Sequence, residues 1–295
     1  MSYKESFLKY LETEKRYSPH TVLSYRNDLE SFRDFLETQG FEGELHQVNS
    51  HDIRAWIVHM LDNGYSSSSV HRKISGLRGF FRFLLKQGLV ESNPLDKVVL
   101  PKKKKVLPVF IDEDSMFKLL DNFDFGDDFK GLRNRTMIEM LYTTGIRRAE
   151  LTGLKCSDVD LVNGTVKVTG KRNKQRIIPL LPSFTARLKE YISRRNSEAK
   201  GSESEWLFLT VNGRKMYDRS VYSIVRSYLK MVTTVEKKSP HVLRHTFATH
   251  MLNRGADLNS IKEFLGHANL SATQVYTHNT FEKLKEVYKR AHPRA

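Results

Sequence analysis

The sequence predicts a mainly α-helical protein with a small antiparallel β-sheet, divided into two domains. The chain of 295 residues is long enough for two hydrophobic cores. Apolar residues recur at helical spacing along most of it, and the hairpin signal Asn163-Gly164 stands between short β-type segments. Three prolines and four consecutive lysines lie between Pro94 and Pro108. We therefore expect a helical domain over residues 1–97, a basic linker over residues 98–108 and a second domain over residues 109–295.

Four helices are expected in the first domain. Two lie within residues 2–40, and the second of them starts at Ser18-Pro19, because serine is a good N-cap and proline fits the first helical turn. A third runs from about Ser50 to Asn63, and a fourth opens at residues 66–69 and ends near Gly88. Helical spacing predicts as core residues Phe7, Leu8, Leu11, Val22, Leu23, Leu29, Phe32, Phe35, Leu36, Ile53, Trp56, Ile57, Met60, Leu61, Val70, Ile74, Leu77, Phe80, Phe81, Leu84 and Leu85.

The second domain is expected to combine helices with the small sheet. Strands are predicted over residues 159–161, 165–169 and 175–180, and a further short strand over residues 206–210. Helices are predicted over residues 112–122, 131–144, 182–195 and 218–232, with two or three more between residues 239 and 278 and a last amphipathic one over residues 280–291.

The charge of the chain indicates a polyanionic partner. The net charge is +15 and the pI about 9.7, which favours nucleic acid first and an acidic membrane second. Residues 1–97 hold 13 basic and 13 acidic side chains, so the whole excess lies in residues 98–295. The segment 64–90 nevertheless lacks any acid, and its basic residues recur every four positions, which predicts a DNA-facing helix. Candidate DNA contacts are Thr21, Ser24, Tyr25, Arg72, Arg78, Arg82, Lys102 and Lys103.

Several classes of protein are not expected. No run approaches the roughly 18 to 20 apolar residues that span a bilayer. The N-terminus has no apolar signal-peptide region, so secretion is not predicted. Cys156 is the only cysteine, which excludes an internal disulfide and a thiolate metal cluster. We expect a cytoplasmic protein that binds double-stranded DNA and does not act on membranes.

The stretch from Ser239 to His278 concentrates side chains that can act on a phosphate. Breaking a DNA strand without a metal needs a nucleophile, positive charge on the phosphate and a proton for the leaving oxygen. Tyr276, in QVYTH, is the candidate nucleophile, and His267, in LGH, can donate to the same phosphate. The stretch contains His241, Arg244, His245, His250, His267, Tyr276 and His278.

Two arginines are the candidates for binding that phosphate. Arg147 and Arg244 suit it because a guanidinium stays charged and forks onto two oxygens. His241 lies three residues before Arg244, so both can address one phosphate from one helix face. A zinc site is the competing interpretation, because His241 and His245 are four residues apart, but Val242 stands where H-E-x-x-H requires glutamate. No metal or other cofactor is therefore expected.

A hairpin lysine is the candidate proton donor. Lys171 follows Gly170 in a turn, from which it can reach the leaving 5′-oxygen if neighbouring cations lower its pKa. Spacing alone leaves alternatives open, because the same loop carries Arg172, Lys174 and Arg176.

These residues together resemble the tyrosine recombinase family, and most of all its Xer-type bacterial members. TGIRRAEL resembles the box TGLRxxEL, GKRNKQRIIPL the box GKGxKxRxxP, SPHVLRHTFATHML the box HxLRHTFATHLL, and LGHANLSATQVYTH the box LGHxxxxTTQxYTH. Four boxes in the right order make the resemblance specific, and it covers nearly the whole chain. Arg172 stands where glycine is usual and Ile146 where leucine is usual, and neither position carries chemistry.

The resemblance implies a fold, a mechanism and an assembly. A helical, SAM-like core-binding domain and an α+β catalytic domain would clamp a DNA half-site. Tyr276 would attack the scissile phosphate and form a 3′-phosphotyrosyl link, with Lys171 protonating the 5′-hydroxyl. Arg147, Arg244 and His267 would stabilise the pentacovalent phosphate, and His241 would assist proton transfer. Four identical or related protomers would exchange strands through a Holliday junction.

The resemblance also implies how the protomers interlock and what they do. The helix over residues 280–291, with Phe281, Leu284 and Val287 on one face, would dock on a neighbouring protomer; packing on its own domain is the alternative. The compact plan favours an Xer-type enzyme that resolves chromosome dimers at cell division, with a division-linked translocase as a further partner. The alternatives are a mobile-element integrase, a type IB topoisomerase and a non-catalytic DNA architectural protein.

Overall fold

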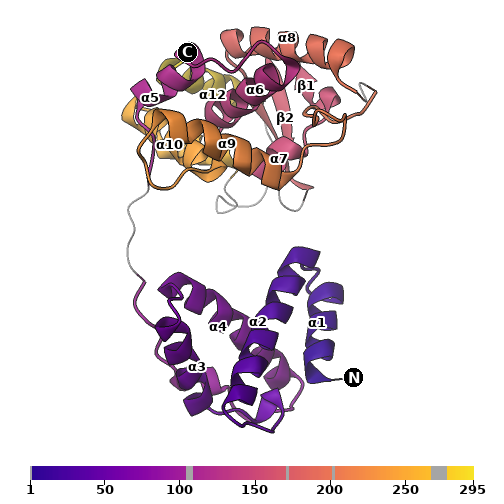
Figure 1. The fold of residues 1–295 in the computed structure, drawn as a ribbon, viewed down its shortest axis with the longest axis vertical. Coiled ribbons are helices and arrows are strands. Elements are labelled where there is room, and N and C mark those ends of the chain that lie inside the picture. The colour runs from indigo at the N-terminus through magenta and orange to yellow at the C-terminus, as the bar shows by residue number, and fades with distance from the viewer. Residues whose placement is uncertain (1, 104–108, 171–172, 201–202, 267–277) are drawn as a thin grey trace. The chain divides into compact units, whose positions relative to one another are not determined.

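The computed structural model describes residues 2–103, 109–170, 173–200, 203–266 and 278–295. The chain forms two compact units, Met1–Val106 and Leu107–Ala295 (Figure 1). Both are mainly helical, and the one sheet found among these described residues lies in the second unit, as the sequence predicted. Among the described residues, no helix has the length and apolar character needed to cross a bilayer.

The first unit is built from four helices: α1 (Tyr3–Thr13), α2 (Pro19–Thr38), α3 (Ser50–Asp62) and α4 (Ser67–Lys86). Each starts where a polar side chain accepts hydrogen bonds from backbone N–H groups of the first turn. These N-caps are Ser2, Ser18, Asn49 and Ser66. Short 3₁₀ turns, η1 (Leu45–Gln47) and η2 (Pro94–Lys97), precede α3 and follow α4.

Most predicted core residues of the first unit are buried, but three are not. Leu23, Leu61 and Leu85 expose 52, 38 and 37% of their surface. Each follows a residue that does face the core, and successive helical residues point about 100° apart, so the second of the pair turns outward. Val98 is buried in the same core, so the packing of this unit continues into the first residue of the expected linker.

The second unit begins with α5 (Glu113–Phe117), which continues into a π-helical turn (Lys118–Asn122), and α6 (Phe129–Thr144). Then follow α7 (Arg148–Thr152), a 3₁₀ turn (Cys156–Asp158) and the strands β1 (Val159–Asp160), β2 (Thr165–Thr169) and β3 (Gln175–Pro179). The remaining helices are α8 (Pro182–Glu198), α9 (Asp218–Val232), α10 (Pro240–Asn253), α11 (Leu258–Leu265) and α12 (His278–Ala291).

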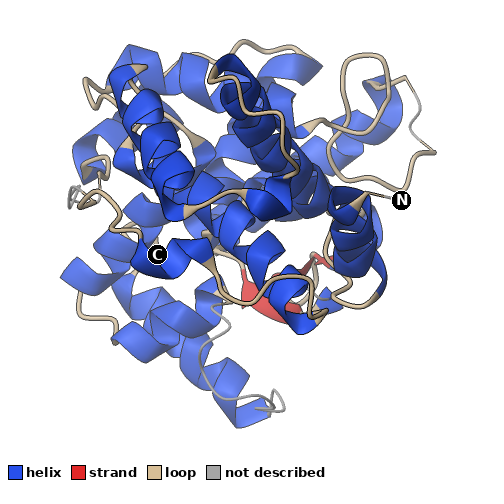
Figure 2. Cartoon of the chain, turned by 90° about the horizontal axis from the view of Figure 1, so that it is seen from below, coloured by secondary structure: helices blue, strands red, loops and turns tan. Residues whose placement is uncertain are grey.

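The three strands form an antiparallel sheet in the order β1-β2-β3 (Figure 2, red). Val166 pairs with Ile178, and both side chains are buried under the helices. The strand predicted over residues 206–210 is wrong. Only isolated bridges occur there, Lys155 with Trp206 and Leu209 with Lys215. The apolar run 207–209 is buried but forms no strand ladder. A short apolar run indicates burial, and its pattern alone does not show whether the segment is a strand.

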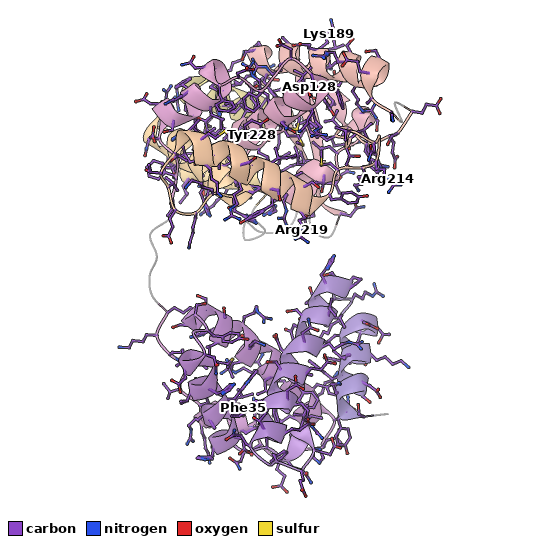
Figure 3. The ribbon with its side chains drawn as sticks, viewed as in Figure 1. Phe35, Asp128, Lys189, Arg214, Arg219 and Tyr228 are labelled. Carbon is purple, nitrogen blue, oxygen red and sulfur yellow. The ribbon has the colours of Figure 1, made fainter. Side chains whose placement is uncertain are left out.

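Helix α6 is the centre of the second unit. Its residues 136–144 are all buried, and it packs against α8 and α10. Asp128, labelled in Figure 3, caps its start by accepting from the Gly131 N–H at 2.7 Å. In contrast to the buried residues of α6, the exposed cations Lys189, Arg214 and Arg219 project from the outer elements of the unit (Figure 3).

The C-terminal helix α12 packs on its own domain. Leu284 and Val287 are buried in the core of the second unit, and the Tyr288 hydroxyl donates to the Thr143 carbonyl at 2.8 Å. Burial of these two apolar positions was predicted correctly, and they pack as in the alternative arrangement, on their own domain. The side chain of Phe281 lies outside the described residues. Docking of this helix on a neighbouring protomer stays a prediction. An apolar stripe shows that a helix face is buried, and it does not show which molecule covers it.

Acid should destabilise this C-terminal packing through His292. The imidazole is 1% exposed among the rings of Tyr142, Phe247 and Tyr288, and its Nδ1 accepts from the Arg294 N–H at 3.1 Å. Burial, helped by the charge of Arg294, lowers the pKa of His292 to about 3. The unfolded chain therefore binds this proton near pH 6.5 while the folded chain does not, so stability falls as the pH drops below 6.5.

Lowering the pH from 7 to 5 should cost about 2 kcal/mol through this residue. Urea denaturation of the wild type and of His292→Phe at both pH values measures it. The phenylalanine variant should lose less stability than the wild type by that amount. An equal loss in both proteins would assign the acid sensitivity to other groups.

Candidate active site

The site begins where α6 ends. Gly145 has a left-handed backbone (φ 61°), and a Cβ on it would lie 2.6 Å from Phe247 Cδ1 and 2.8 Å from Leu265 Cδ2. Only glycine fits both the conformation and the space. The chain then turns, and Arg147 becomes the N-cap of α7 in an extended conformation. This turn brings Arg147 close to α10 and to the C-terminal end of α11.

A buried carboxylate anchors Arg147. Glu150 accepts from the Arg147 backbone N–H and from Arg147 Nη1, both at 2.8 Å. The same carboxylate accepts from Arg176 Nη1 at 3.1 Å and Nη2 at 2.8 Å. Burial acts to raise the pKa of Glu150, but the bonds from Arg176, and then those from Arg147, outweigh it and the pKa is lowered. Glu150 is therefore an anion at neutral pH.

Arg244 is held by two backbone carbonyls. Its guanidinium donates from Nη1 to the Gly145 carbonyl and from Nη2 to the Leu265 carbonyl, both at 2.6 Å. Burial, followed by the charges of Arg147 and Arg176 and partly offset by Glu150, lowers the pKa of Arg244 to about 10. The group is still charged at pH 7. Burying this charged guanidinium is unfavourable, and a bound anion would offset part of that free energy.

Two arginines hold the C-terminal end of α11. Arg176 Nε donates to the Phe264 carbonyl at 2.8 Å, next to the Leu265 carbonyl that Arg244 occupies. Cations are favourable at a helix C-terminus. Gly266, again left-handed (φ 62°), lies against the guanidinium of Arg176, since a Cβ there would be 3.2 Å from Nη1. The predicted His267 follows directly in the sequence.

His241 adds a neutral base at the start of α10. Its side chain is exposed. The protein around it still removes part of its hydration, and this desolvation, followed by the charges of Arg148, His245, Arg244 and Arg147, lowers its pKa below 6.5. The imidazole is therefore unprotonated at pH 7 and can accept a proton. The structure thus places three predicted residues close together, because the charges of Arg147 and Arg244 act on the imidazole of His241.

The other predicted catalytic residues, Lys171, His267 and Tyr276, lie outside the described residues. Gly170, directly before Lys171, does lie at the site, because a Cβ on it would be 3.3 Å from Glu150 Oε1. Arg176 was one of the open alternatives for the proton donor. That alternative is wrong, because its guanidinium is buried and engaged with Glu150 and Phe264.

Glu150 and the role of Arg176 were not predicted from the sequence. The available signal was the i, i+3 spacing of Arg147 and Glu150, which places a carboxylate beside the arginine in the first turn of a helix. Nothing local in the sequence pairs Glu150 with Arg176, 26 positions away.

In the first unit, candidate DNA contacts line a cationic and aromatic cavity. It has a volume of about 470 Å³, and Arg78, Arg82 and Tyr25 are among the residues that line it, together with Lys15 and Tyr17. Burial, followed by the neighbouring Tyr17 and Asp28, raises the pKa of Tyr25. The phenol therefore stays neutral, and the cavity carries a net positive charge.

Arg72 and Thr21 have contacts within the protein. Arg72 donates to both oxygens of the buried Asp28 at 2.7 Å and to Ser24 Oγ at 2.8 Å, with its side chain still 52% exposed. The backbone N–H of Thr21 donates to the cap residue Ser18. Lys102 and Lys103 are exposed.

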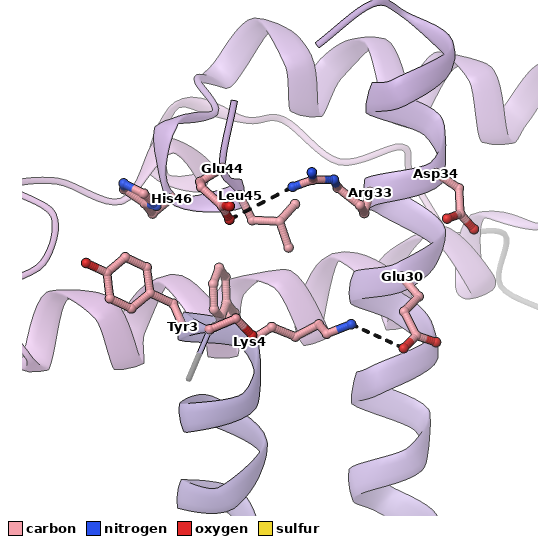
Figure 4. A pocket seen from close by; sticks show the side chains of 10 residues that line it. Tyr3, Lys4, Glu30, Arg33, Asp34, Glu44, Leu45 and His46 are labelled. Carbon is pink, nitrogen blue, oxygen red and sulfur yellow. Dashed lines mark hydrogen bonds and ion pairs between the residues drawn. The ribbon is translucent and has the colours of Figure 1, made fainter. Parts of the chain in front are cut away.

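A second cavity in the first unit is not a comparable anion site. It measures about 310 Å³ and is lined by residues including Tyr3 and His46 (Figure 4). Its cations are paired with acids: Lys4 Nζ lies 3.3 Å from Glu30, and Arg33 Nη1 lies 4.0 Å from Glu44 (Figure 4, dashed lines).

Comparison with known families identifies the class of protein. The sequence pattern of the phage integrase family matches residues 109–283, and that of the phage integrase N-terminal SAM-like domain matches residues 5–88. The chain belongs to the phage integrase family, the tyrosine recombinases. It is therefore an enzyme that breaks and rejoins DNA, as its motifs predicted.

The chain is similar over nearly its whole length to proteins named tyrosine recombinase XerC. That of Chlorobaculum parvum is 40% identical over 99% of this chain and 94% of its own length. That of Halalkalibacterium halodurans is 42% identical over 98% and 97% of the two chains. The predicted likeness to Xer-type members is confirmed.

Solved structures share the fold. The Tn1549 transposon integrase in complex with circular intermediate DNA has a TM-score of 0.69 and 20% identity, covering 96% of this chain and 98% of its own. The XerH recombinase bound to palindromic difH has a TM-score of 0.71 and 23% identity over 96% and 83%. These likenesses concern the fold, and they confirm the predicted fold class.

Proposed function

We propose that this enzyme is a site-specific recombinase that cuts DNA through a 3′-phosphotyrosyl link at Tyr276. The observation that carries the proposal is the placement of Arg147 and Arg244 at the Gly145 turn, with His241 one helical turn before Arg244 on α10. Two fixed guanidinium groups can neutralise a phosphate that gains negative charge in the transition state. No nucleotide or other energy source is required, because the phosphodiester bond energy is kept in the phosphotyrosine.

The proposed chemistry is an in-line displacement at phosphorus. The Tyr276 oxygen forms a bond to phosphorus as the bond to the sugar 5′-oxygen breaks. Lys171 gives its proton to that leaving oxygen, while the neutral imidazole of His241 assists by accepting the proton of the Tyr276 phenol. Arg147, Arg244 and His267 stabilise the pentacovalent phosphate. Attack on the phosphotyrosine by a 5′-hydroxyl from a second DNA reverses the same step and rejoins the strands.

We further propose that four protomers, identical or paired with a related recombinase, act on two DNA sites through a Holliday junction. The likeness to XerC proteins over nearly their full length supports a role in resolving chromosome dimers at cell division in the cytoplasm. A division-linked DNA translocase would then be a further partner. A mobile-element integrase is the alternative; the transposon integrase shares the fold, and the fold alone does not distinguish the two roles.

A plasmid assay tests the recombinase proposal against a topoisomerase that shares the same chemistry. Two copies of a site recovered by trapping the enzyme on genomic DNA are placed on one supercoiled plasmid. A recombinase yields two circles or an inversion. Relaxed plasmid without exchanged segments would identify a solitary topoisomerase, and unchanged plasmid with tight binding would favour an architectural protein.

The acid-free face of α4 supplies a testable DNA contact. Arg82→Gln should weaken binding to the site about three- to tenfold and lower the slope of log Kd against log salt by about one, because one phosphate contact is lost. Arg54→Gln, an exposed arginine on α3 bonded to Ser50, is the matched control. Fluorescence anisotropy at several salt concentrations measures both. Equal effects of the two variants would remove Arg82 from the DNA interface.

A further inference from the structure

We propose that Arg176 is a positioning residue, which keeps Arg147 available to the scissile phosphate by serving as the main counterion of Glu150. This inference rests on the proposed function. Arg176 itself is not assigned to the phosphate, because all three of its guanidinium nitrogens already donate: Nη1 and Nη2 to Glu150, and Nε to the Phe264 carbonyl.

The carboxylate of Glu150 is shared unequally between two arginines. Arg176 forks onto both oxygens through Nη1 and Nη2, whereas the side chain of Arg147 reaches Oε1 through Nη1 alone. Within the described part of the chain, Nε and Nη2 of Arg147 have no partner, and the side chain is 30% exposed. Arg147 is thus held by one edge and has the other edge free for an anion.

Loss of Arg176 would change this division. Glu150 is 4% exposed in its side chain, so among the residues that the structure describes, a carboxylate without Arg176 would have Arg147 as its one adjacent cation. A buried, uncompensated carboxylate attracts the nearest guanidinium strongly. Arg147 would then turn its second edge to Glu150 and be lost to the phosphate.

The same guanidinium also fixes two backbone segments. Nε holds the Phe264 carbonyl at the end of α11, and a Cβ on Gly266 would lie 3.3 Å from Arg176 Cζ. On the hairpin side, a Cβ on Gly170 would lie 3.7 Å from Arg176 Nη1. Both glycines precede residues assigned to the reaction, so Arg176 ties the hairpin, α7 and α11 at one point.

A charge-rescue experiment tests the proposal. Single-turnover cleavage of a nicked DNA site, recovered by trapping, is measured for the wild type, Arg176→Met, Glu150→Gln and the double variant. Arg176→Met should cleave about 100-fold more slowly at unchanged DNA affinity. Removing the carboxylate as well should raise the rate at least tenfold above that of Arg176→Met, because Arg147 is released.

Arg133→Met is the control for losing a buried arginine. Arg133 is 4% exposed and donates to the Leu209 carbonyl. It lies near the start of α6, whereas Gly145 follows the end of that helix. Its folded fraction should cleave at the wild-type rate. Arg176→Lys, which keeps the charge without the fork, should fall between the wild type and Arg176→Met.

The outcomes distinguish failure of the proposed function from failure of the positioning role of Arg176. Absence of a covalent adduct with the wild type would overturn the proposed function. A cleaving wild type, combined with a double variant as slow as Arg176→Met or slower, would leave the proposed function intact and overturn the positioning role. Melting temperatures of all variants show what fraction of each is folded when rates are compared.

Discussion

Replacement of Tyr276 by phenylalanine is expected to abolish strand cleavage, with a loss of about 10⁵-fold or more, while DNA affinity stays within about twofold. The phenol oxygen is the atom that bonds to phosphorus, and removing it leaves an otherwise complete phosphate site. Single-turnover cleavage of a nicked site and anisotropy binding measure the two quantities separately.

Tyr222→Phe is the matched control. Tyr222 lies on α9 with 37% of its surface exposed, and we place it outside the reaction. This variant should cleave like the wild type. Cleavage that survives in Tyr276→Phe, or an adduct that still forms on another tyrosine, would show that the nucleophile lies elsewhere in the chain.

Replacement of Arg244 by lysine should give the second largest effect. The change keeps a positive charge but removes the fork, and with it the ability to hold the Gly145 and Leu265 carbonyls and still face a phosphate. By analogy with arginines that stabilise phosphoryl transfer, cleavage should fall about 10³- to 10⁵-fold. DNA affinity should change little, because one phosphate among many is affected.

Arg219→Lys, on the exposed face of α9, is the control for an arginine-to-lysine change (Figure 3). Its rate and affinity should both match those of the wild type. If Arg244→Lys lost affinity in the same proportion as cleavage, Arg244 would act in DNA binding alone. The melting temperature has to be recorded as well, because the two carbonyls that Arg244 holds lose their donors.

The features that sequence predicted best depend on local interactions. Ser18-Pro19 starts a helix and Asn163-Gly164 turns a hairpin through contacts within a few residues, and both lie where predicted. Gly145 could be placed at a helix end, but its close approach to Phe247 and Leu265 depends on segments about 100 positions away. The fold class therefore followed from the sequence, while the tight packing around the site did not.

The candidate site was predictable in part for the same reason. Arg147, Arg244 and His241 were found because phosphate chemistry needs their residue types and because their motifs resemble a known family. Glu150 and Arg176 act through a buried pair between α7 and β3, which no periodicity reveals. The sequence also could not show which molecule packs against the apolar face of α12, since Leu284 and Val287 would be apolar in either arrangement.

The measurement that tests the central claim most directly is mass spectrometry of the trapped complex. Wild-type enzyme is incubated with a nicked site, digested with nuclease and protease, and the peptide that contains Tyr276 is sequenced. We predict a nucleotide joined through its 3′-phosphate to the Tyr276 oxygen. A nucleotide on any other side chain, or a 5′-phosphate linkage, would contradict the mechanism proposed for this enzyme.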